Sequence, residues 1–444
     1  MELPSTGDYA HVVVRMDTGT IDNPDKDSGV AHFLEHMNFG GFGAYETAFE
    51  IKKAVNQKCG NHLNAFTTSS ATVYSMEIPA SELSFGVDTL LGMCFESHLT
   101  ERSLENEKRV ITQEIGLREG DLVKETFAAL ASVMWGEQHP YTWDTLGTRE
   151  GVGALDLKQI RAFRDEHYTP ERAIISVAGN VTHEEVMRAV EDSMPKRTHP
   201  GEKKSRPKSE FIGGENRKVK EWSDHLTLNL AFDFGSHSTA PDTKQGLMLE
   251  IFDELLGSNT NGMGALELRL RDEKSLTYFA RSRIMAAEGN AALTISTRAG
   301  YENAEEIVKE TCKLLRDFPG GVSEDDFAVA KKRVAKSRDR QAEPSRVTHY
   351  LAGDLCRYGR VITSKDIEAL AEDISLGEFR EFAKEVLGGK VAMVAMGKQE
   401  ALDKIPSVNF ISEQICRNYR RLSDVQAGKW EEFAMKSRGA EIQR

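Results

Sequence analysis

The spacing of apolar and polar residues along the chain predicts a succession of helices. Apolar side chains recur every three or four positions in many segments, which is the period of a helix with one buried face. We expect helices at residues 28–38, 45–57, 80–96, 101–119, 155–167, 182–193, 243–256, 264–274, 302–317, 323–340 and 376–387.

Other segments have the pattern of β-strands. The strict alternation at Leu226, Leu228, Leu230, Phe232 and Phe234 predicts a strand with one face on a core. The apolar run at residues 12–14 predicts a short strand, and residues 64–78 are rich in β-branched and aromatic residues, as in a hairpin. Strands and helices interleave, so the predicted class is α/β or α+β.

A faint internal repeat relates the two halves of the chain. Residues 155–179 and 376–397 each read as an amphipathic helix followed by an apolar strand that ends in glycine, and Gly397 follows Gly179 by 397 − 179 = 218 residues. Arg161 and Phe163 recur at the same offset, as Arg380 and Phe382. We therefore predict two similar domains related by duplication, each a mixed β-sheet covered by helices in an α+β, sandwich-like fold.

The predicted domain boundaries follow from a polar stretch between the two copies. Residues 196–218 are rich in Lys, Pro and Gly and lack apolar periodicity, which is typical of a linker. The prediction is an N-terminal domain at 1–195, this linker, a C-terminal domain of the same fold at 219–410 and a tail at 411–444.

Composition narrows the class of protein without naming an activity. The 444 residues carry a net charge of −13, which argues against nucleic acid as the main partner because phosphate binding needs a basic face. No apolar run is long enough to span a bilayer, so we expect no membrane association. The five cysteines are widely spaced without a C-x-x-C pair, and the N-terminus has no secretion signal, so a cytoplasmic protein is expected.

Residues 29–37, GVAHFLEHM, contain the strongest chemical motif. His32 and His36 are four residues apart and project from one face of a helix, where neutral imidazoles can bind zinc. Glu35 precedes the second histidine and can take a proton from a water whose pKa the metal lowers. This His-x-x-Glu-His order is the inverzincin signature, although five residues of this kind also arise by chance in a helix with two partly buried histidines.

A third protein ligand is needed, and residues 100–119 form a predicted helix rich in carboxylates. Glu107 and Glu114 are seven residues apart and share a helix face, so Glu114 can complete the metal site while Glu107 orients a ligand. A solvated charged helix is the ordinary alternative. Spacing alone does not rank the candidate carboxylates, which are Glu101, Glu105, Glu107, Glu114 and Glu119.

Nearly the whole chain, from about residue 10 to about residue 405, resembles the pitrilysin family of zinc peptidases, in particular its two-domain members of mitochondrial-processing-peptidase type. The resemblance is carried by SGVAHFLEHMNFGG at 28–41, NHLNAFTT at 61–68, ENEKRVITQEI at 105–115, HPYTWDTLG at 139–147 and YTPERAIISVAGNV at 168–181.

The resemblance implies a set of site residues. It makes His32, His36 and Glu114 the ligands of one Zn²⁺ per chain, Glu35 the residue that activates water, and Glu107 the supporting carboxylate. It also makes Asn64, Ala65 and Phe66 part of a substrate-binding edge strand, which would pair with an extended peptide through backbone hydrogen bonds. An ordinary internal strand is the alternative.

The second half carries an Arg and a Tyr seven residues apart, Arg271 and Tyr278. In the pitrilysin family, an Arg and a Tyr at this spacing contact the substrate across the cavity from zinc. The resemblance therefore implies that Arg271 would hold a substrate carbonyl and that Tyr278 would stabilise the oxyanion. A surface Arg and a core Tyr are the alternative. Ser275 stands where the family commonly has glycine.

The resemblance finally implies a partner. Peptidases of this kind enclose a peptide substrate between two such two-domain units, so we expect a chamber formed by two subunits. A homodimer suffices because this chain carries both elements, and a heterodimer is the second possibility. The expected activity is that of a zinc metalloendopeptidase acting on peptides or unfolded segments. The competing hypothesis is a non-catalytic subunit of a heterodimeric peptidase that only binds peptide.

Overall fold

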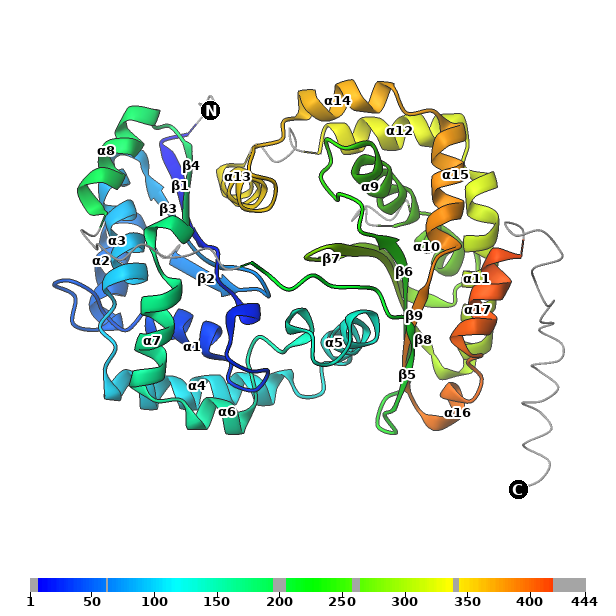
Figure 1. Ribbon diagram of the computed structural model, residues 1–444, viewed down its shortest axis with the longest axis horizontal. Coiled ribbons are helices and arrows are strands. Elements are labelled where there is room, and N and C mark those ends of the chain that lie inside the picture. The colour runs from blue at the N-terminus through cyan, green and yellow to red at the C-terminus, as the bar shows by residue number, and fades with distance from the viewer. Residues whose placement is uncertain (1–6, 61–62, 195–204, 258–263, 338–342, 418–444) are drawn as a thin grey trace. The chain divides into compact units, whose positions relative to one another are not determined.

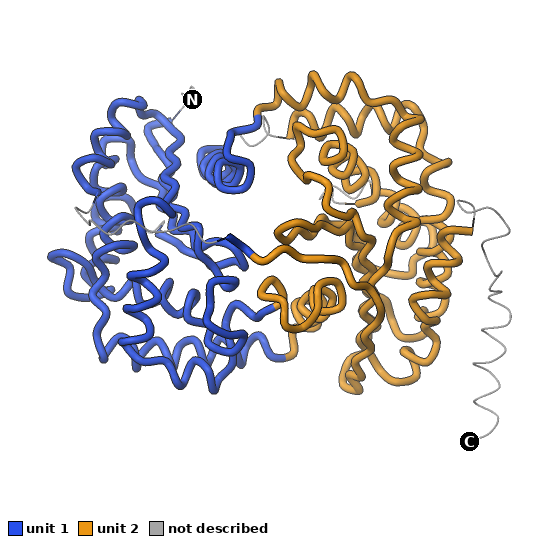
Figure 2. Tube along the Cα trace, viewed as in Figure 1, with its two compact units in different colours: residues 1–119, 143–206, 338–362 blue, residues 120–142, 207–337, 363–444 orange. Residues whose placement is uncertain are grey.

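A computed structural model describes residues 7–60, 63–194, 205–257, 264–337 and 343–417. These form two compact units, coloured separately in Figure 2. Unit 1 contains residues 1–119, 143–206 and 338–362, and unit 2 contains residues 120–142, 207–337 and 363–444. Each unit has its own sheet and its own helices, and each is described by itself below. Within the described residues, no helix has the length and apolarity that crossing a membrane requires.

Unit 1 is built on a four-stranded sheet in the order β2-β3-β1-β4. Its strands are β1 (Tyr9–Met16), β2 (Leu63–Thr67), β3 (Thr72–Pro79) and β4 (Ala173–Gly179). All three pairings are antiparallel. The helices of unit 1 are α1 (Val30–Met37), α2 (Ala48–Cys59), α3 (Leu83–Glu96), α4 (Glu101–Arg118), α6 (Arg149–Ala154), α7 (Leu157–His167), α8 (His183–Ser193) and α13 (Pro344–Tyr358).

The two faces of this sheet are covered differently. Alternate residues of β1, including Val12 and Val14, are fully buried in a large core that residues of α1, α3 and α7 share. Val13 points to the other face, where it packs with Ala352 of α13. Figure 1 shows α13 and α8 on opposite sides of the strand β4. The apolar run at residues 12–14 of β1 is buried on both faces, as expected of a strand that is covered on both sides.

Unit 2 is built on a five-stranded sheet in the order β5-β9-β6-β8-β7. Its strands are β5 (Gly214–Val219), β6 (His225–Gly235), β7 (Thr277–Ala287), β8 (Asn290–Gly300) and β9 (Val391–Gly397). The pair β5–β9 is parallel and the other pairs are antiparallel. The helices of unit 2 are α5 (Leu122–Trp135), α9 (Lys244–Leu256), α10 (Ala265–Glu267), the π-helical turn η5 (Leu268–Glu273), α11 (Ala304–Gly321), α12 (Glu324–Ala335), α14 (Ser364–Glu372), α15 (Leu376–Leu387), α16 (Gln399–Leu402) and α17 (Val408–Cys416).

The structure carries the internal repeat seen in the sequence. The helix–strand pair α7–β4 corresponds to α15–β9, and four strands occupy the same order in both sheets. The repeated arginines make the same contact. Arg161 donates a 2.8 Å hydrogen bond to the carbonyl of Leu99, and Arg380 donates one of 2.8 Å to the carbonyl of Val322, each just before the next helix begins. The predicted α+β fold of two similar halves is confirmed, with a mixed sheet in unit 2 and an antiparallel one in unit 1.

One helix of each half belongs to the other half's unit. The helix α5 comes from the N-terminal half of the chain but packs on β6 and β9 of unit 2. The helix α13 comes from the C-terminal half but packs on β1 and β4 of unit 1. The compact units are therefore not contiguous in sequence, whereas the division at residues 196–218 expected two contiguous domains. Residues 214–219 of the expected linker form the strand β5.

All the helices expected from the sequence are present, with shifts of a few residues at their ends. They are the ones predicted to begin at residues 28, 45, 80, 101, 155, 182, 243, 264, 302, 323 and 376. The helices α5, α6, α13, α14, α16 and α17 were not expected. The strand β6 differs in one respect, since residues of both faces, such as Leu228 and Ala231, are buried instead of one face only. The helix α5 packs on β6 and buries the second face of this strand.

Candidate metal and peptidase site

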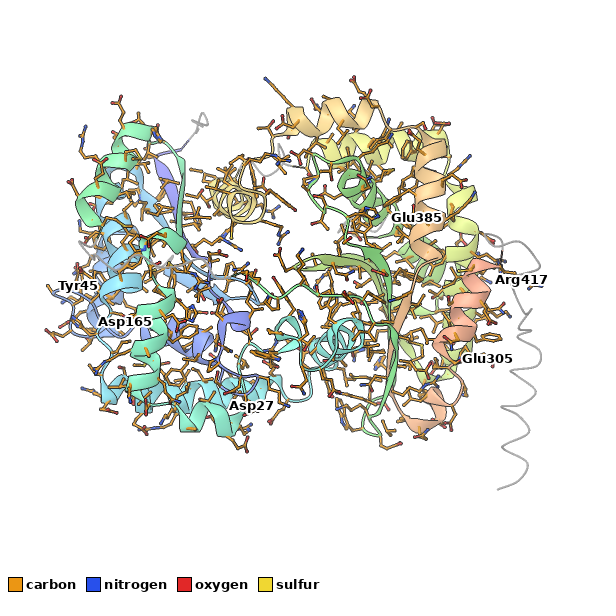
Figure 3. All side chains as sticks on the ribbon, viewed as in Figure 1. Asp27, Tyr45, Asp165, Glu305, Glu385 and Arg417 are labelled. Carbon is orange, nitrogen blue, oxygen red and sulfur yellow. The ribbon has the colours of Figure 1, made fainter. Side chains whose placement is uncertain are left out.

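The helix α1 positions the His-x-x-Glu-His motif. Its N-cap is Gly29, which has a positive φ of 59°, and a Cβ there would lie 2.4 Å from the carbonyl oxygen of Leu146. Because glycine has no capping side chain, Asn23 accepts a 3.0 Å hydrogen bond from the Ala31 amide instead. Just before the helix, the carbonyl of Asp27, labelled in Figure 3, accepts a 2.9 Å bond from the Thr148 amide. The start of α1 is therefore fixed from two sides.

The helix α4 supplies the carboxylates that face α1. It begins at a capping box in which Thr100 and Ser103 bond to each other's backbone amides. Leu104 and Ile111 anchor it in the core of unit 1, and it packs against α1. Glu107 and Glu114, both part-exposed, point toward the histidines. The seven-residue spacing thus places both carboxylates on one face, as expected.

Both imidazoles converge on one oxygen of Glu114. Its Oε2 lies 3.8 Å from His32 Nε2 and 3.7 Å from His36 Nε2. The two rings approach edge to face, with centroids 4.6 Å apart. In a tetrahedral zinc site with bonds near 2.1 Å, ligand atoms are about 3.4 Å apart, so this spacing is close to what the ion needs. His32, His36 and Glu114 are therefore a donor set that fits zinc.

Glu107 fixes the orientation of His36. Its carboxylate lies 3.0 Å from His36 Nδ1, so it can accept the Nδ1 proton and leave the Nε2 lone pair free for a metal on the side that faces Glu114. Burial lowers the pKa of His36, but the hydrogen bond to Glu107 and the charges of Glu114, Glu35 and Glu107 outweigh it and raise that pKa overall. Burial, the neighbouring His36 and Arg118 lower the pKa of His32 to about 3, which keeps that ring neutral.

Glu35 lies between the histidines in sequence and beside them in space. Its side chain is 6% exposed, and His32, Glu35 and His36 each offer a polar atom within 4.8 Å of the others. Burial raises the pKa of Glu35, partly opposed by a hydrogen bond from the Thr67 hydroxyl. Thr67 donates to Oε2 of Glu35, whereas Oε2 of Glu114 approaches both Nε2 atoms, so the geometry is compatible with Glu114 as the third ligand and Glu35 as the group that transfers a proton.

The other carboxylates of the helix are engaged elsewhere. Glu105 pairs with Lys108 at 3.2 Å, and Glu119 pairs with Arg149 at 2.9 Å. Glu101 lies exposed in the first turn of α4. Of the five candidates, Glu107 and Glu114 are the two whose carboxylates lie within 4 Å of a histidine nitrogen, at 3.0, 3.7 and 3.8 Å. The sequence placed Thr67 at the end of the expected edge strand but did not predict its hydrogen bond to Glu35.

The strand β2 ends beside this cluster. It carries Asn64, Ala65 and Phe66 and lies at one edge of the unit 1 sheet, paired among the described residues with β3 alone. Asn64 and Phe66 are exposed and Ala65 is half-buried. The ring of Phe66 lies 5.7 Å from that of His349 on α13. Among the described residues, β2 is therefore an edge strand and not an internal one, and its last residue, Thr67, contacts Glu35.

Arg271 and Tyr278 both lie on the surface of unit 2. Arg271 is in η5, with Glu267 at 3.9 Å and Asp272 at 3.8 Å, and Tyr278 is 93% exposed at the start of the edge strand β7. The alternative of a core tyrosine is therefore wrong. Ser275, between them, has a φ of 54° and is the one described non-glycine residue with a positive φ. This left-handed conformation explains why a glycine is expected there.

Two family models match the chain. The model described as insulinase, peptidase family M16, matches residues 2–142, and the model described as peptidase M16 inactive domain matches residues 154–334. A mitochondrial-processing peptidase subunit beta of Dictyostelium discoideum is 31% identical over 425 residues, which cover 91% of this chain and 87% of that protein. An uncharacterized zinc protease of Bacillus subtilis is 27% identical over 331 residues, covering 72% of this chain and 76% of the relative.

Solved structures share the two-unit fold. A protease from Helicobacter pylori has a TM-score of 0.77 at 20% identity, covering 88% of this chain and 95% of that one. A peptidase M16 inactive domain from Pseudomonas fluorescens has a TM-score of 0.74 at 15% identity, covering 89% and 94%. At these identities the likeness supports the fold alone.

Proposed function

Since this chain belongs to the M16 peptidase family, which confirms the resemblance drawn from its sequence, we propose that it is a zinc metalloendopeptidase that cuts peptides or unfolded segments. The observation that carries the proposal is the convergence of His32 Nε2 and His36 Nε2 on the Glu114 carboxylate, with Glu35 beside them. A helix pair held together for structure alone has no need of this donor set.

His32, His36 and Glu114 would hold one Zn²⁺ per chain. When bound, zinc would polarise the scissile carbonyl and make a water more acidic. Glu107 would keep the Nδ1 proton on His36, so that the Nε2 lone pair faces the metal position. Burial keeps His32 neutral, which is the form that binds a metal.

Glu35 would act as general base and then as general acid. Its carboxylate would accept a proton from the attacking water and return that proton to the leaving amine, a role that typically contributes about 10²–10⁴-fold. Burial raises the pKa of Glu35, which makes it a stronger base than an exposed glutamate. The Thr67 hydroxyl would hold the carboxylate in place.

The remaining residues would handle the substrate. An extended peptide would add to the β2 edge, pairing with the backbone at Asn64, Ala65 and Phe66. In the proposed homodimer, Arg271 and Tyr278 would act on a substrate held at the metal cluster of the other subunit, where Arg271 would hold a carbonyl and Tyr278 would stabilise the oxyanion. Both are exposed, which is required of residues that contact a substrate.

A second subunit would complete the chamber. One relative is named as the beta subunit of a mitochondrial-processing peptidase, and a structure of complex III2 from Candida albicans contains a chain of the same fold, with a TM-score of 0.76 at 13% identity. We propose a homodimer, because this chain carries both the metal cluster and the Arg–Tyr element, and a cytoplasmic location. A heterodimer in which this chain only binds peptide is the second candidate.

Cleavage of a quenched fluorescent peptide by the purified protein tests the proposal. We expect cleavage that a zinc chelator abolishes and that Glu35→Gln reduces by a factor of at least 100 while zinc content stays unchanged. Glu105→Gln, on the same helix as Glu107 and Glu114 but paired with Lys108, is the control and should cleave normally. Full activity of Glu35→Gln would refute the assignment of the base. No chelator-sensitive cleavage by the protein alone would favour the peptide-binding subunit.

A further inference from the structure

Three arginines occupy neighbouring positions on one face of the unit 2 sheet. Arg281 and Arg283 are two residues apart on the edge strand β7 (Figure 1), so their side chains project from the same face. Arg281 is paired with Ser296 of β8, and Arg298 lies two residues further along β8. Arg298 is therefore a diagonal neighbour of Arg281 on that face, within reach of a long side chain. We call these three residues the arginine strip.

The arginine strip has no counter-charge within the part of the chain that the structure describes. None of its three guanidinium groups forms an ion pair with a described carboxylate, and the buried Nε of Arg298 has no hydrogen-bond partner there. Like charges at neighbouring positions of a sheet repel each other, and a buried donor without a partner costs free energy as well. A bound anion would remove both costs.

Aromatic rings hold two of the arginines in place. The guanidinium carbon of Arg281 lies 5.5 Å from the ring centroid of Phe279, and that of Arg283 lies 5.1 Å from the ring centroid of Phe127 on α5. Such contacts orient a guanidinium group through its face. Both arginines are exposed, so their N–H groups are accessible to a ligand.

Protection of the sheet edge does not account for the whole strip. Charged side chains on an edge strand discourage pairing with other strands, which is an ordinary role for Arg281 and Arg283. Arg298, however, lies on β8, which has β6 on one side and β7 on the other. Opposite Ser296 lies Asn229 of β6, which is 1% exposed and whose side-chain polar atoms have no partner among the described residues. Polar groups in need of partners thus extend from the edge into the sheet.

The position of the strip relates it to the proposed substrate contact at Tyr278. At a rise of about 3.3 Å per residue, Arg281 lies about 10 Å and Arg283 about 17 Å along β7 from Tyr278. An extended peptide has a similar rise, so side chains roughly three to five residues from the bond at Tyr278 would reach the strip. Guanidinium groups bind carboxylates through charge-assisted hydrogen bonds.

We propose that the arginine strip binds acidic side chains of the peptide substrate, so that the peptidase prefers segments with Glu or Asp roughly three to five residues from the cleaved bond. This proposal rests on the peptidase function proposed above, which brings the substrate to Tyr278. Two carboxylates two residues apart in an extended segment project from one side, as Arg281 and Arg283 do. The same strip would repel segments rich in Lys and Arg.

Fluorescence polarisation with the full-length Glu35→Gln protein tests the preference without cleavage. The probe is a labelled peptide of Ala, Thr and Val with Glu at two positions two residues apart, and the reference probe has Gln at both positions. At low ionic strength we expect the Glu probe to bind about tenfold more tightly than the Gln probe. Equal binding of the two probes, or no binding of the Glu probe, would overturn the proposal.

Substitutions separate a direct contact from general charge. Arg281→Gln and Arg298→Gln should each weaken binding of the Glu probe by about threefold or more and leave binding of the Gln probe unchanged. Lys309→Gln removes an exposed positive charge from α11 of the same unit and should leave the preference unchanged. If Arg281→Gln and Arg298→Gln weaken both probes equally, these arginines support the fold instead of contacting acidic side chains, and the proposal is overturned.

Cleavage by the unmodified protein separates this proposal from the peptidase function itself. We expect kcat/KM for the Glu peptide to exceed that for the Gln peptide, and Arg281→Gln to remove the difference. Equal cleavage of both peptides would overturn the preference. A protein that cleaves neither peptide but binds the Glu probe about tenfold more tightly would contradict the peptidase function and support the arginine strip as a site for acidic segments.

Discussion

The contact between Glu107 and His36 gives the sharpest test of how the candidate metal site is organised. The carboxylate lies 3.0 Å from Nδ1, and the side chains of His36 and Glu107 are 18% and 25% exposed. In Glu107→Gln the amide oxygen can still accept the Nδ1 proton, but the negative charge that strengthens the bond is lost. We therefore expect zinc to bind more weakly while the fold is unchanged.

The size of the effect follows from the geometry. Hydrogen bonds to charged groups contribute about 1.5–3 kcal/mol and neutral ones about 0.5–1.5 kcal/mol, so losing the charge costs roughly 1–1.5 kcal/mol at this partly exposed site. That corresponds to about a tenfold loss of zinc affinity, at the lower end of the 10–100-fold range known for residues that support metal ligands.

Competition for zinc against a chromophoric chelator measures this change directly. Glu105→Gln is the matched control, because Glu105 lies on the same helix and pairs with Lys108 instead of a histidine. Unchanged zinc affinity in Glu107→Gln would refute the role of Glu107 in orienting His36. An equal loss in Glu105→Gln would show that general charge on α4, and not the contact with His36, controls affinity.

Two further predictions concern stability. Ser275→Gly should stabilise unit 2 by about 0.5–1 kcal/mol, because glycine adopts the left-handed backbone at φ 54° without strain, whereas Ser275→Ala should give no gain. Urea unfolding measures the stability of both variants. No gain in stability from Ser275→Gly would contradict the explanation. Burial and the neighbouring His349 lower the pKa of His11 to about 4, so this histidine is neutral when folded but takes up a proton below about pH 6.5 when unfolded. His11 should therefore lower the free energy of unfolding by up to about 2 kcal/mol between pH 7 and pH 5. His11→Gln should remove this loss. An equal pH dependence of unfolding in both proteins would contradict the role of His11.

The sequence predicted an element well where that element has one apolar face and one polar face. The helix α4 has Leu104 and Ile111 inward and carboxylates outward, so both its extent and the shared face of Glu107 and Glu114 followed from periodicity. The repeat was visible because Arg161 and Arg380 recur at the same offset, and in the structure each donates a hydrogen bond to a carbonyl just before a helix. Patterns of this kind are local, because the spacing of residues within one or two helical turns determines them.

The exchange of helices could not be predicted in the same way. The helices α5 and α13 pack on sheets whose strands are distant in sequence, and no local pattern states which sheet a helix will cover. The second buried face of β6 has the same origin, since Ala231 packs in the cluster that contains Leu130 of α5. Spacing likewise left five glutamates as candidates until the distances from both histidines to Glu114 were known.

The metal content of the purified protein tests the central claim most directly. Elemental analysis should find one zinc per chain in the unmodified protein and in Glu105→Gln, and much less in His32→Ala and in Glu114→Ala. An unmodified protein that binds no zinc when the ion is supplied, or a His32→Ala variant that keeps one zinc per chain, would contradict the account.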